Sequence, residues 1–574
     1  MTAIARIIAL VLPLSLFTSV AVAQPSLKDM DAELRQYDKV GQFSGAVLVA
    51  KGDKVLYRGA IGNAVEEWNI PNDVDTRFRI GSLTKQFTAA LILQLAEEER
   101  IDLQAPITSY LPDYPREQGD RVTVYQLLTQ TSGIVNYTSL PEFQKNIKRR
   151  HLAVDSLPSV FSKEKLEFTP GSAFAYSNSN YFLLGLIIEK VTKQRYDYAL
   201  RERILRPLGL DNTGYDHNDQ VIPRLAQGYY IGAGVRSRAD FIDSNIPYAA
   251  GMLYSTVGDL WKWTRALHAG KVFRKSATLE LMLKPAKGTY ACGLMVTSLM
   301  AGKDSVRAVL HSGGIDGFSA QLWYLPEGEY TIAALDNTTG DAGALAKAAF
   351  ALLHGIKAPK PRIPISQVIF DIIAEKGVDA GIARYRTLKK EHPDEYDFSE
   401  SELNALGYSF ISNARFDIAR SLFALNLEMY PDAWNTWDSM GEVLALLDEK
   451  DEAIRHYRKA LELNPGSISA REALRKLGAE VKDEMPAPSA EMLEQYVGQY
   501  ELVPGFILTV TREGTRLFLQ ATGQERFEVY PMSETSFFLK VVDARITFQR
   551  DEAGAVNGLI LHQNGRDMPA TRKP

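Results

Sequence analysis

The sequence predicts a multidomain protein: a domain of mixed strands and helices, then all-α repeats, then a small antiparallel β-barrel. Three observations support this prediction. Strand patterns flank a helical stretch in residues 24–357, a 34-residue repeat lies within residues 358–482, and short alternating apolar runs fill residues 488–574. The length of 574 residues is consistent with three or four domains.

Composition excludes several classes of protein. Hydrophobic residues make up 45% and charged residues 24% of the chain, an ordinary globular balance. The formal net charge of -5 gives no basic excess, so no nucleic-acid partner is expected. The single cysteine, Cys292, excludes an internal disulfide, and neither a zinc-type Cys/His spacing nor an HExxH motif occurs. We therefore expect no metal and no cofactor.

Residues 1–23 resemble a secretory signal peptide. Arg6 precedes the apolar run "IIALVLPLSLF", and an Ala-x-Ala sequence follows at Ala21–Ala23. A membrane anchor is the alternative, but the run is short for a span and polar sequence follows closely. We expect a secreted or periplasmic protein with no stable membrane span after signal cleavage.

The first domain combines strands from both of its ends. "SGAVLVAKGDKVLYRGAIG" predicts a hairpin around Gly52-Asp53, and "AVLHSGGIDGFSAQLWYLPEGEYTIAALDN" predicts three further strands. Helical sequence lies between them, notably at 82–99, 180–194 and 257–268. We expect one antiparallel sheet flanked by helices, with a helical subdomain inserted between its strands.

After the Pro- and Lys-rich linker at 357–367 the strand signal disappears and a repeat begins. Four pairs of small, aromatic or proline positions recur at a spacing of 34 residues: Gly407 and Gly441, Ala419 and Ala453, Phe423 and Tyr457, Pro431 and Pro465. This is the tetratricopeptide period, and a weaker helix pair precedes it at 367–393. Such repeats bind a protein or peptide partner, or they act only as a spacer.

A second linker, 483–490, precedes the barrel. Alternating runs such as "FILTVTREGTRLFLQA", with turns at Glu513-Gly514 and Asn564-Gly565, predict short antiparallel strands. We interpret Phe537 and Phe538 as structural rather than ligand-binding. With "YVGQY" at 496–500 and the closing "LILHQNGRDMPATR", the segment resembles a lipocalin-like domain. It either shapes the mouth of an active site or is ordinary barrel core.

The stretch "IGSLTKQFTA" contains the first candidate catalytic pair. Ser82 and Lys85 share one face of a helix at spacing i, i+3, and Gly81 lets the chain enter that helix tightly. The apolar surroundings should desolvate Lys85 and lower its pKa. A serine beside a neutral amine is the minimal unit of covalent catalysis.

Taken alone, this pattern is weak, because Ser-x-x-Lys recurs at Ser162–Lys165 in a polar stretch. Two further motifs strengthen it. Tyr176-Ser177-Asn178 is the only Tyr-x-Asn among 26 tyrosines, and His311-Ser312-Gly313 is the only match to [Lys/His]-[Ser/Thr]-Gly. A core tyrosine is the alternative interpretation of Tyr176.

These motifs resemble the serine β-lactamase and penicillin-binding group, in the branch with class C β-lactamases and D-alanyl-D-alanine carboxypeptidases. "FRIGSLTKQFTA", "LLTQTSGI", "FTPGSAFAYSNSNYFLLGLIIEKVT", "GMLYSTVGDLWKW" and "HSGGIDGFSAQLWYLPEGEYTIAALDN" resemble family blocks in family order, over roughly residues 30–355. The resemblance implies an α/β β-lactamase/transpeptidase-like fold for this domain.

The resemblance also implies roles for individual residues. Ser82 would be the acylated nucleophile, Lys85 would help to deprotonate it, and Tyr176, as a phenolate or a hydrogen-bonded phenol, would shuttle the proton. Substrate binding and the oxyanion hole would involve Asn178, His311, Ser312 and Gly313, together with the N–H groups of Ser82 and Gly314.

The sequence departs from the family pattern at His311, where β-lactamases have lysine. A histidine is mostly neutral at pH 7, so it recognises a substrate carboxylate less well. Gln130 replaces a histidine that is frequent in relatives, and no Glu-x-x-Leu-Asn block or Gly-x-Ser-x-Gly motif occurs.

We therefore expect an exported serine hydrolase acting through an acyl-enzyme on small amides, D-amino-acid peptides or esters, like a D-Ala-D-Ala carboxypeptidase, D-peptidase or esterase. A β-lactamase is the alternative. A cell-wall-peptide sensor or protein-interaction module with a vestigial site is an alternative of another class.

Overall fold

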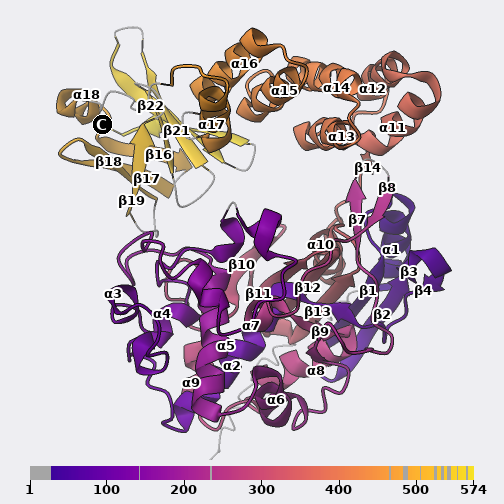
Figure 1. The fold of residues 1–574 in the computed structure, drawn as a ribbon, viewed down its shortest axis with the longest axis vertical. Coiled ribbons are helices and arrows are strands. Elements are labelled where there is room, and N and C mark those ends of the chain that lie inside the picture. The colour runs from indigo at the N-terminus through magenta and orange to yellow at the C-terminus, as the bar shows by residue number, and fades with distance from the viewer. Residues whose placement is uncertain are drawn as a thin grey trace, which may run out of the picture.

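The computed structural model describes residues 27–140, 142–232, 235–464, 467–481, 489–503, 506–521, 526–531, 535–539, 544–551, 554–563 and 566–573. The expected signal peptide, residues 1–23, lies outside the described residues, as does most of the expected linker 483–490. Three parts follow one another along the chain: a mixed α/β domain, an arm of helices and a barrel (Figure 1).

A six-stranded antiparallel sheet forms the centre of the first domain, with the order β10-β11-β12-β13-β1-β2. The strands are β1 (Gly45–Lys51), β2 (Lys54–Ile61), β10 (Met295–Ala301), β11 (Asp304–Ile315), β12 (Phe318–Leu325) and β13 (Tyr330–Asp336). β1 pairs with β13 so that Gly45 faces Asp336, which confirms a sheet built from both ends of the domain. The sequence does not predict β10, because its residues at the sheet edge are mostly half-buried and show no clear alternation.

Helices cover both faces of this sheet. α1 (Met30–Lys39) and α10 (Ala342–Leu353) pack on one face, and α2 (Thr84–Glu97), α5 (Asn178–Thr192) and α8 (Val257–His268) belong to the core on the other. Successive residues of β1 point into different cores. Val47 packs in the core with α1 and α10, and Leu48 packs in the core with α2, α5 and α8. This two-sided burial explains why β1 reads as a continuous apolar run.

The inserted subdomain and the sheet margins contain shorter elements. The helices are α3 (Arg116–Gly119), α4 (Val124–Leu128), α6 (Tyr196–Leu200), α7 (Tyr248–Gly251) and α9 (Ser276–Met282). The strands are β3 (Asn63–Val65), β4 (Ile70–Pro71), β5 (Phe78–Arg79), β6 (Gly214–Tyr215), β7 (Tyr229–Gly232), β8 (Val235–Arg238) and β9 (Leu253–Ser255).

The arm consists of antiparallel helix pairs. These are α11 (Ile365–Lys376) with α12 (Val378–Glu391), α13 (Glu400–Ser412) with α14 (Phe416–Met429), and α15 (Trp434–Leu446) with α16 (Lys450–Leu463), followed by α17 (Ile468–Lys476); β14 (Ile363–Pro364) and β15 (Tyr396–Asp397) flank the first pair. Gly407 lies against the ring of Phe423, and Gly441 lies against Tyr457. The predicted small and aromatic positions are therefore the contacts between paired helices.

The C-terminal part begins with α18 (Ala490–Glu494) and closes into an eight-stranded antiparallel barrel. The strands are β16 (Gly498–Val503), β17 (Phe506–Glu513), β18 (Arg516–Ala521), β19 (Arg526–Pro531), β20 (Ser536–Leu539), β21 (Ala544–Arg550), β22 (Val556–Gln563) and β23 (Arg566–Arg572). Phe537 is fully buried in the barrel core, and Phe538 packs on Tyr530 with ring centroids 5.7 Å apart. The Glu513-Gly514 turn joins β17 to β18, whereas Asn564-Gly565 lies outside the described residues.

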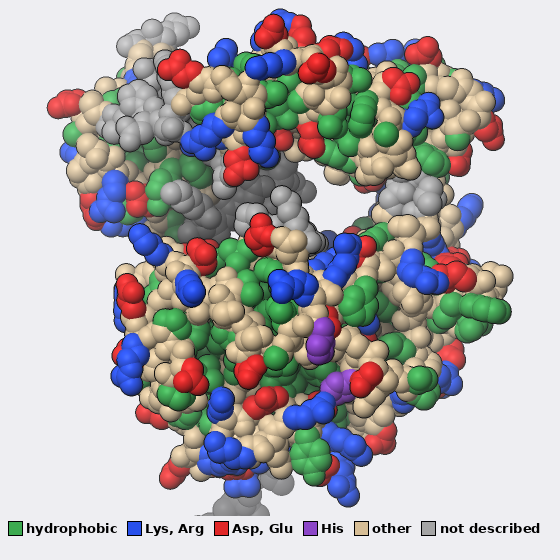
Figure 2. Space-filling model, viewed as in Figure 1, with side chains coloured by type: hydrophobic (Ala, Val, Ile, Leu, Met, Phe, Trp, Pro, Cys, Tyr) green, Lys and Arg blue, Asp and Glu red, His purple; other side chains and the backbone are tan. Residues whose placement is uncertain are grey.

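The visible surface intersperses cationic and anionic side chains, and an opening separates part of the helical arm from the α/β domain (Figure 2). Within the described ranges, no helix is both long enough and apolar enough to cross a membrane.

Candidate active site

Ser82 lies in a short 3-10 turn, η3 (Gly81–Leu83), immediately before α2. Gly81 has φ +50°, a left-handed conformation that glycine adopts without strain. The expected helix over 82–99 therefore begins as a tighter turn and becomes α-helical at Thr84. This turn places Lys85 Nζ 3.0 Å from Ser82 Oγ.

The Lys85 side chain is completely buried. Besides Ser82, its amine has two partners, Asn178 Oδ1 at 2.8 Å and the Ala250 carbonyl oxygen at 2.8 Å. The described residues place no carboxylate in an ion pair with it, and burial lowers the pKa of the Lys85 ammonium well below its usual value. The desolvation that the apolar sequence predicts is therefore present.

Asn178 is the first residue of α5 and joins two parts of the site. Its Oδ1 accepts from Lys85, its Nδ2 donates to Thr138 Oγ1 at 3.1 Å, and its backbone N–H donates to Asn136 Oδ1 at 3.0 Å. These contacts fix the orientation of the amide, so its oxygen faces the lysine.

Tyr176 lies just before α5, and 36% of its surface is exposed. Its hydroxyl forms a hydrogen bond with Ser82, and Lys85 Nζ lies 4.9 Å from the ring centroid. Desolvation of the hydroxyl raises the pKa of Tyr176 above that of a free phenol, although the bond to Ser82 lowers it in part. Of the two forms that the resemblance allows, this environment favours the hydrogen-bonded phenol over the phenolate.

His311 is buried in β11, where its ring makes two contacts. Nδ1 lies 2.5 Å from the Ser312 carbonyl oxygen, and Nε2 lies 3.3 Å from the Tyr290 hydroxyl. Burial, then the nearby Lys85 charge, lowers the pKa of His311 to about 4, despite an opposing effect of the Ser312 contact. The imidazole is therefore neutral at pH 7, as the sequence argument expects. The Ser312 side chain is exposed on the same strand.

β11 passes close to η3, the turn that holds Ser82. β10 pairs with β11 only as far as Leu310. Beyond Leu310, β11 has no β10 partner on that side and contacts η3 instead. A Cβ on Gly313 would lie 2.0 Å from the Ile80 carbonyl oxygen, and one on Gly81 would lie 2.7 Å from the Gly314 nitrogen. Glycine at both positions allows the backbone of β11 to approach Ser82.

A cavity of about 210 Å³ opens beside Ser82. Its lining is mostly apolar, and consists of Ser82, Tyr137, Thr138, Phe143, Asn178, Ile242, Ile246, Pro247, Ala250, Gly251, Gly314, Ile315 and Asp316. Tyr176 and His311 are not part of this lining, so they stand on another side of the serine. The site therefore has an apolar chamber on one side and the Tyr176–His311 pair on the other.

The structure reveals positioning residues that the sequence does not assign. Gln130 has φ +59°, and its Oε1 accepts from Ser177 N at 3.1 Å and from Asn180 Nδ2 at 2.6 Å, which holds the segment that bears Tyr176 and Asn178. The block "LLTQTSGI" marks this position, but not the contact. Tyr290 lies in an irregular loop, and no sequence signal identifies it.

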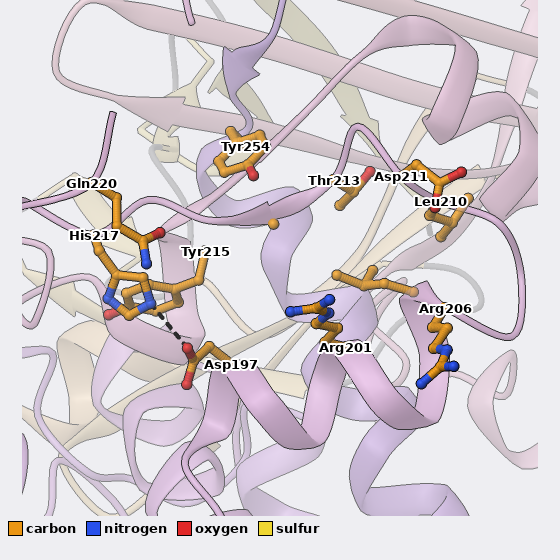
Figure 3. Close-up of a pocket in the computed structure, with 12 residues that line it drawn as sticks. Asp197, Arg201, Arg206, Leu210, Asp211, Thr213, Tyr215, His217, Gln220 and Tyr254 are labelled. Atoms are coloured by element: carbon orange, nitrogen blue, oxygen red, sulfur yellow. Dashed lines mark hydrogen bonds and ion pairs between the residues drawn. The ribbon is translucent and has the colours of Figure 1, made fainter. Parts of the chain in front are cut away.

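A larger cavity, of about 490 Å³, lies elsewhere on the α/β domain (Figure 3). Asp197, Arg201, Tyr215, His217 and Tyr254 are among its lining residues, and His217 Nε2 lies 2.9 Å from Asp197 Oδ2. None of the motif residues lines it, and its lining contains no serine or cysteine. Ser82, Asn178 and Gly314 line the smaller cavity instead.

Three family models match the chain. Residues 30–355 match the Beta-lactamase model, residues 434–467 match the Tetratricopeptide repeat model, and residues 482–572 match a domain of unknown function, DUF3471. The first match covers more than half of the chain.

Individual proteins show the same relationship. The chain is 29% identical over 329 residues to protein flp of Staphylococcus aureus (strain MRSA252), a match that covers 55% of this chain and 64%, less than two thirds, of that relative's length. A D-stereospecific amidohydrolase from Streptomyces sp. is 30% identical, with a TM-score of 0.50 over 57% of this chain and 99% of its own. The octameric penicillin-binding protein homologue from Pyrococcus abyssi is similar in fold, at 19% identity and a TM-score of 0.51 over 95% of this chain and 100% of its own.

Proposed function

Because this chain belongs to the Beta-lactamase family, we propose that it is a serine hydrolase that works through an acyl-enzyme on Ser82. The main support is the buried Lys85 amine, 3.0 Å from the Ser82 hydroxyl. Burial favours the neutral amine, which is the form that can accept a proton.

The hydrogen bonds of Lys85 also support proton transfer from Ser82 to Lys85. A neutral amine has two N–H donors and one lone pair. Asn178 Oδ1 and the Ala250 carbonyl oxygen can only accept, so they take the two donors. The lone pair is left for the Ser82 O–H, which donates its proton to Lys85 as its oxygen attacks the substrate carbonyl.

Tyr176 completes the proton path. Its phenol passes a proton to the leaving nitrogen or oxygen as the bond to the carbonyl carbon breaks, and it is reprotonated by the proton that Lys85 took from Ser82. In the second half the proton moves the other way: water loses a proton to this pair, attacks the acyl carbonyl, and Ser82 regains its hydrogen. The backbone N–H groups of Ser82 and Gly314 stabilise the oxyanion in both halves.

The favoured substrates are small amides, D-amino-acid peptides and esters. The neutral His311 offers no charge to a β-lactam or terminal carboxylate. The similarity to a D-stereospecific amidohydrolase at 30% identity points in the same direction. We further propose export to the periplasm, on the basis of Arg6 and Ala21–Ala23.

The test uses a fluorescent penicillin and a fluorophosphonate probe on the full chain. We expect labelling that Ser82→Ala abolishes, whereas the matched variant Ser162→Ala, in the second Ser-x-x-Lys, retains it. Parallel assays with nitrocefin, p-nitrophenyl butyrate and D-Ala-D-Ala peptides then rank the substrates. Faster nitrocefin turnover would identify a β-lactamase.

A second role in protein interaction is favoured by the tetratricopeptide match at 434–467. If neither probe labels folded wild-type protein, this role replaces the hydrolase as the leading function.

A further inference from the structure

Asp316 is the only charged residue among those lining the cavity beside Ser82. It lies in the Asp316-Gly317 turn between β11 and β12, directly after Gly314 and Ile315 of the same lining. Its side chain is 14% exposed. A carboxylate in a mostly apolar cavity requires a partner, because an unpaired buried charge is costly.

One oxygen of this carboxylate is held by the protein. Lys148 Nζ lies 2.5 Å from Asp316 Oδ1, and the Tyr230 hydroxyl donates to the same oxygen at 2.5 Å. Lys148 is itself 4% exposed, and its other acidic neighbour, Asp240 at 3.4 Å, also pairs with the exposed Arg149. These contacts fix Asp316 in one orientation.

The second oxygen, Oδ2, has no hydrogen-bond or ion-pair partner within the described part of the chain. It therefore remains available as an acceptor on a fixed, preorganised carboxylate. Such an acceptor suits an N–H donor, above all an ammonium group, since charge-assisted hydrogen bonds are the stronger ones.

The position of Asp316 just after β11 determines how far its carboxylate lies from the reacting carbonyl of the substrate. Tyr176, which serves the leaving group in the proposed mechanism, does not line the cavity, so the cavity receives the acyl part of the substrate. Asp316 follows Gly314 by two residues, a separation of about 7 Å along an extended chain. A donor nitrogen on the carbon next to the carbonyl lies within reach of that distance.

We propose that Asp316 selects acyl groups that carry an α-ammonium, so that the substrates are amides, peptides or esters of apolar α-amino acids with a free amino group. The apolar side chain of the substrate contacts Tyr137, Phe143, Ile242 and Ile246, and its ammonium donates to Asp316 Oδ2. Lys148 is a positioning residue that holds the carboxylate. This inference rests on the proposed acyl-enzyme function of Ser82.

The test compares two p-nitroanilides on the full chain: phenylalanine p-nitroanilide, as each enantiomer, and its des-amino analogue, 3-phenylpropionyl p-nitroanilide. The readout is the ratio of their kcat/KM values. In the wild type we expect the better phenylalanine enantiomer to exceed the analogue by about tenfold or more, as a charge-assisted hydrogen bond predicts. Asp316→Asn should bring the ratio close to one.

Asp240→Asn is the matched control, because it removes the other acidic neighbour of Lys148 without touching the cavity lining. Its ratio should stay at the wild-type value. A wild-type ratio near one, or an equal fall of the ratio in both variants, would overturn the role of Asp316. If Asp316→Asn does not fold, Asp316→Ser provides the same comparison. Failure of the proposed function looks different, since neither anilide would then show turnover that Ser82→Ala removes.

Discussion

The Tyr290 hydroxyl and His311 Nε2 lie 3.3 Å apart, so the imidazole of the third motif is tied to the protein interior. Nδ1 of the same ring faces the Ser312 carbonyl oxygen, which can only accept. The ring is therefore a neutral donor at Nδ1 and an acceptor at Nε2. Neither nitrogen presents charge to a substrate.

Replacing His311 with lysine should improve reaction with β-lactams. A lysine brings a positive charge to the edge of the cleft, where a β-lactam carboxylate would lie, and we expect acylation by a fluorescent penicillin to rise about tenfold. The measurement is the labelling rate against time. His311→Gln, which stays neutral, should give no gain, and an unchanged rate in His311→Lys would contradict the charge argument.

Activity should fall on the acid side because Lys85 becomes protonated. Its pKa is lowered well below the usual value, and the amine must be neutral to accept the Ser82 proton, so kcat/KM should rise with pH through that pKa and then level off. His311 has a pKa of about 4, so any limb that it produced would lie near pH 4. A pH–rate profile of His311→Gln should therefore keep the acid limb of the wild type.

Replacing Lys85 with arginine should abolish most of the hydrolase activity. Its guanidinium stays protonated, so no base remains beside Ser82, and we expect kcat/KM to fall by about a thousandfold or more. Lys165→Arg, in the second Ser-x-x-Lys, is the control and should retain wild-type activity. Substantial turnover by Lys85→Arg would assign the base to another group.

Alanine at Gly313 should damage the site through the backbone. The added Cβ would lie 2.0 Å from the Ile80 carbonyl oxygen, so β11 or η3 must shift, at a cost of about 2 kcal/mol or more in unfolding free energy. Gly314→Ala is a control for stability, since its Cβ would meet nothing within 4 Å. Calorimetric unfolding of the two variants measures the difference, and equal stability would show that the strand adjusts freely.

Alanine at Gly407 should loosen the helical arm. Its Cβ would lie 2.2 Å from the Phe423 ring, and we expect a loss of about 1–3 kcal/mol. Gly441→Ala should cost less, because the corresponding distance to Tyr457 is 3.0 Å. Thermal unfolding followed by far-UV circular dichroism compares the variants. A larger effect at Gly441 would reverse the order that packing predicts.

The sequence is most informative where a local pattern determines a local contact. Ser82 and Lys85 are three residues apart, so helical geometry alone predicts their proximity, and the repeat spacing likewise predicts the contact of Gly407 with Phe423. Tyr176 and Asn178 are far from Ser82 in the sequence, so local geometry does not predict that they reach the same site. Their prediction depends on the family resemblance.

Other parts of the site leave little trace in the sequence. The Ala250 contact to Lys85 comes from a backbone carbonyl, which any residue supplies, and Tyr290 belongs to a loop without periodicity. The ion pair of Lys148 with Asp316 joins residues of distant segments, so only the tertiary fold brings them together. β10 is missed for the related reason that a half-exposed edge strand has a weak pattern.

The pairing of Gly45 with Asp336 also constrains biosynthesis. The ribosome makes β1 and β2 early, yet the open edge of β1 gains its neighbour only after residue 336 has been translated. Until then the nascent hairpin presents unpaired amide and carbonyl groups to its surroundings, a template for aggregation. This topology delays completion of the central sheet until late in synthesis, and it makes chaperone binding to the emerging N-terminal hairpin advantageous.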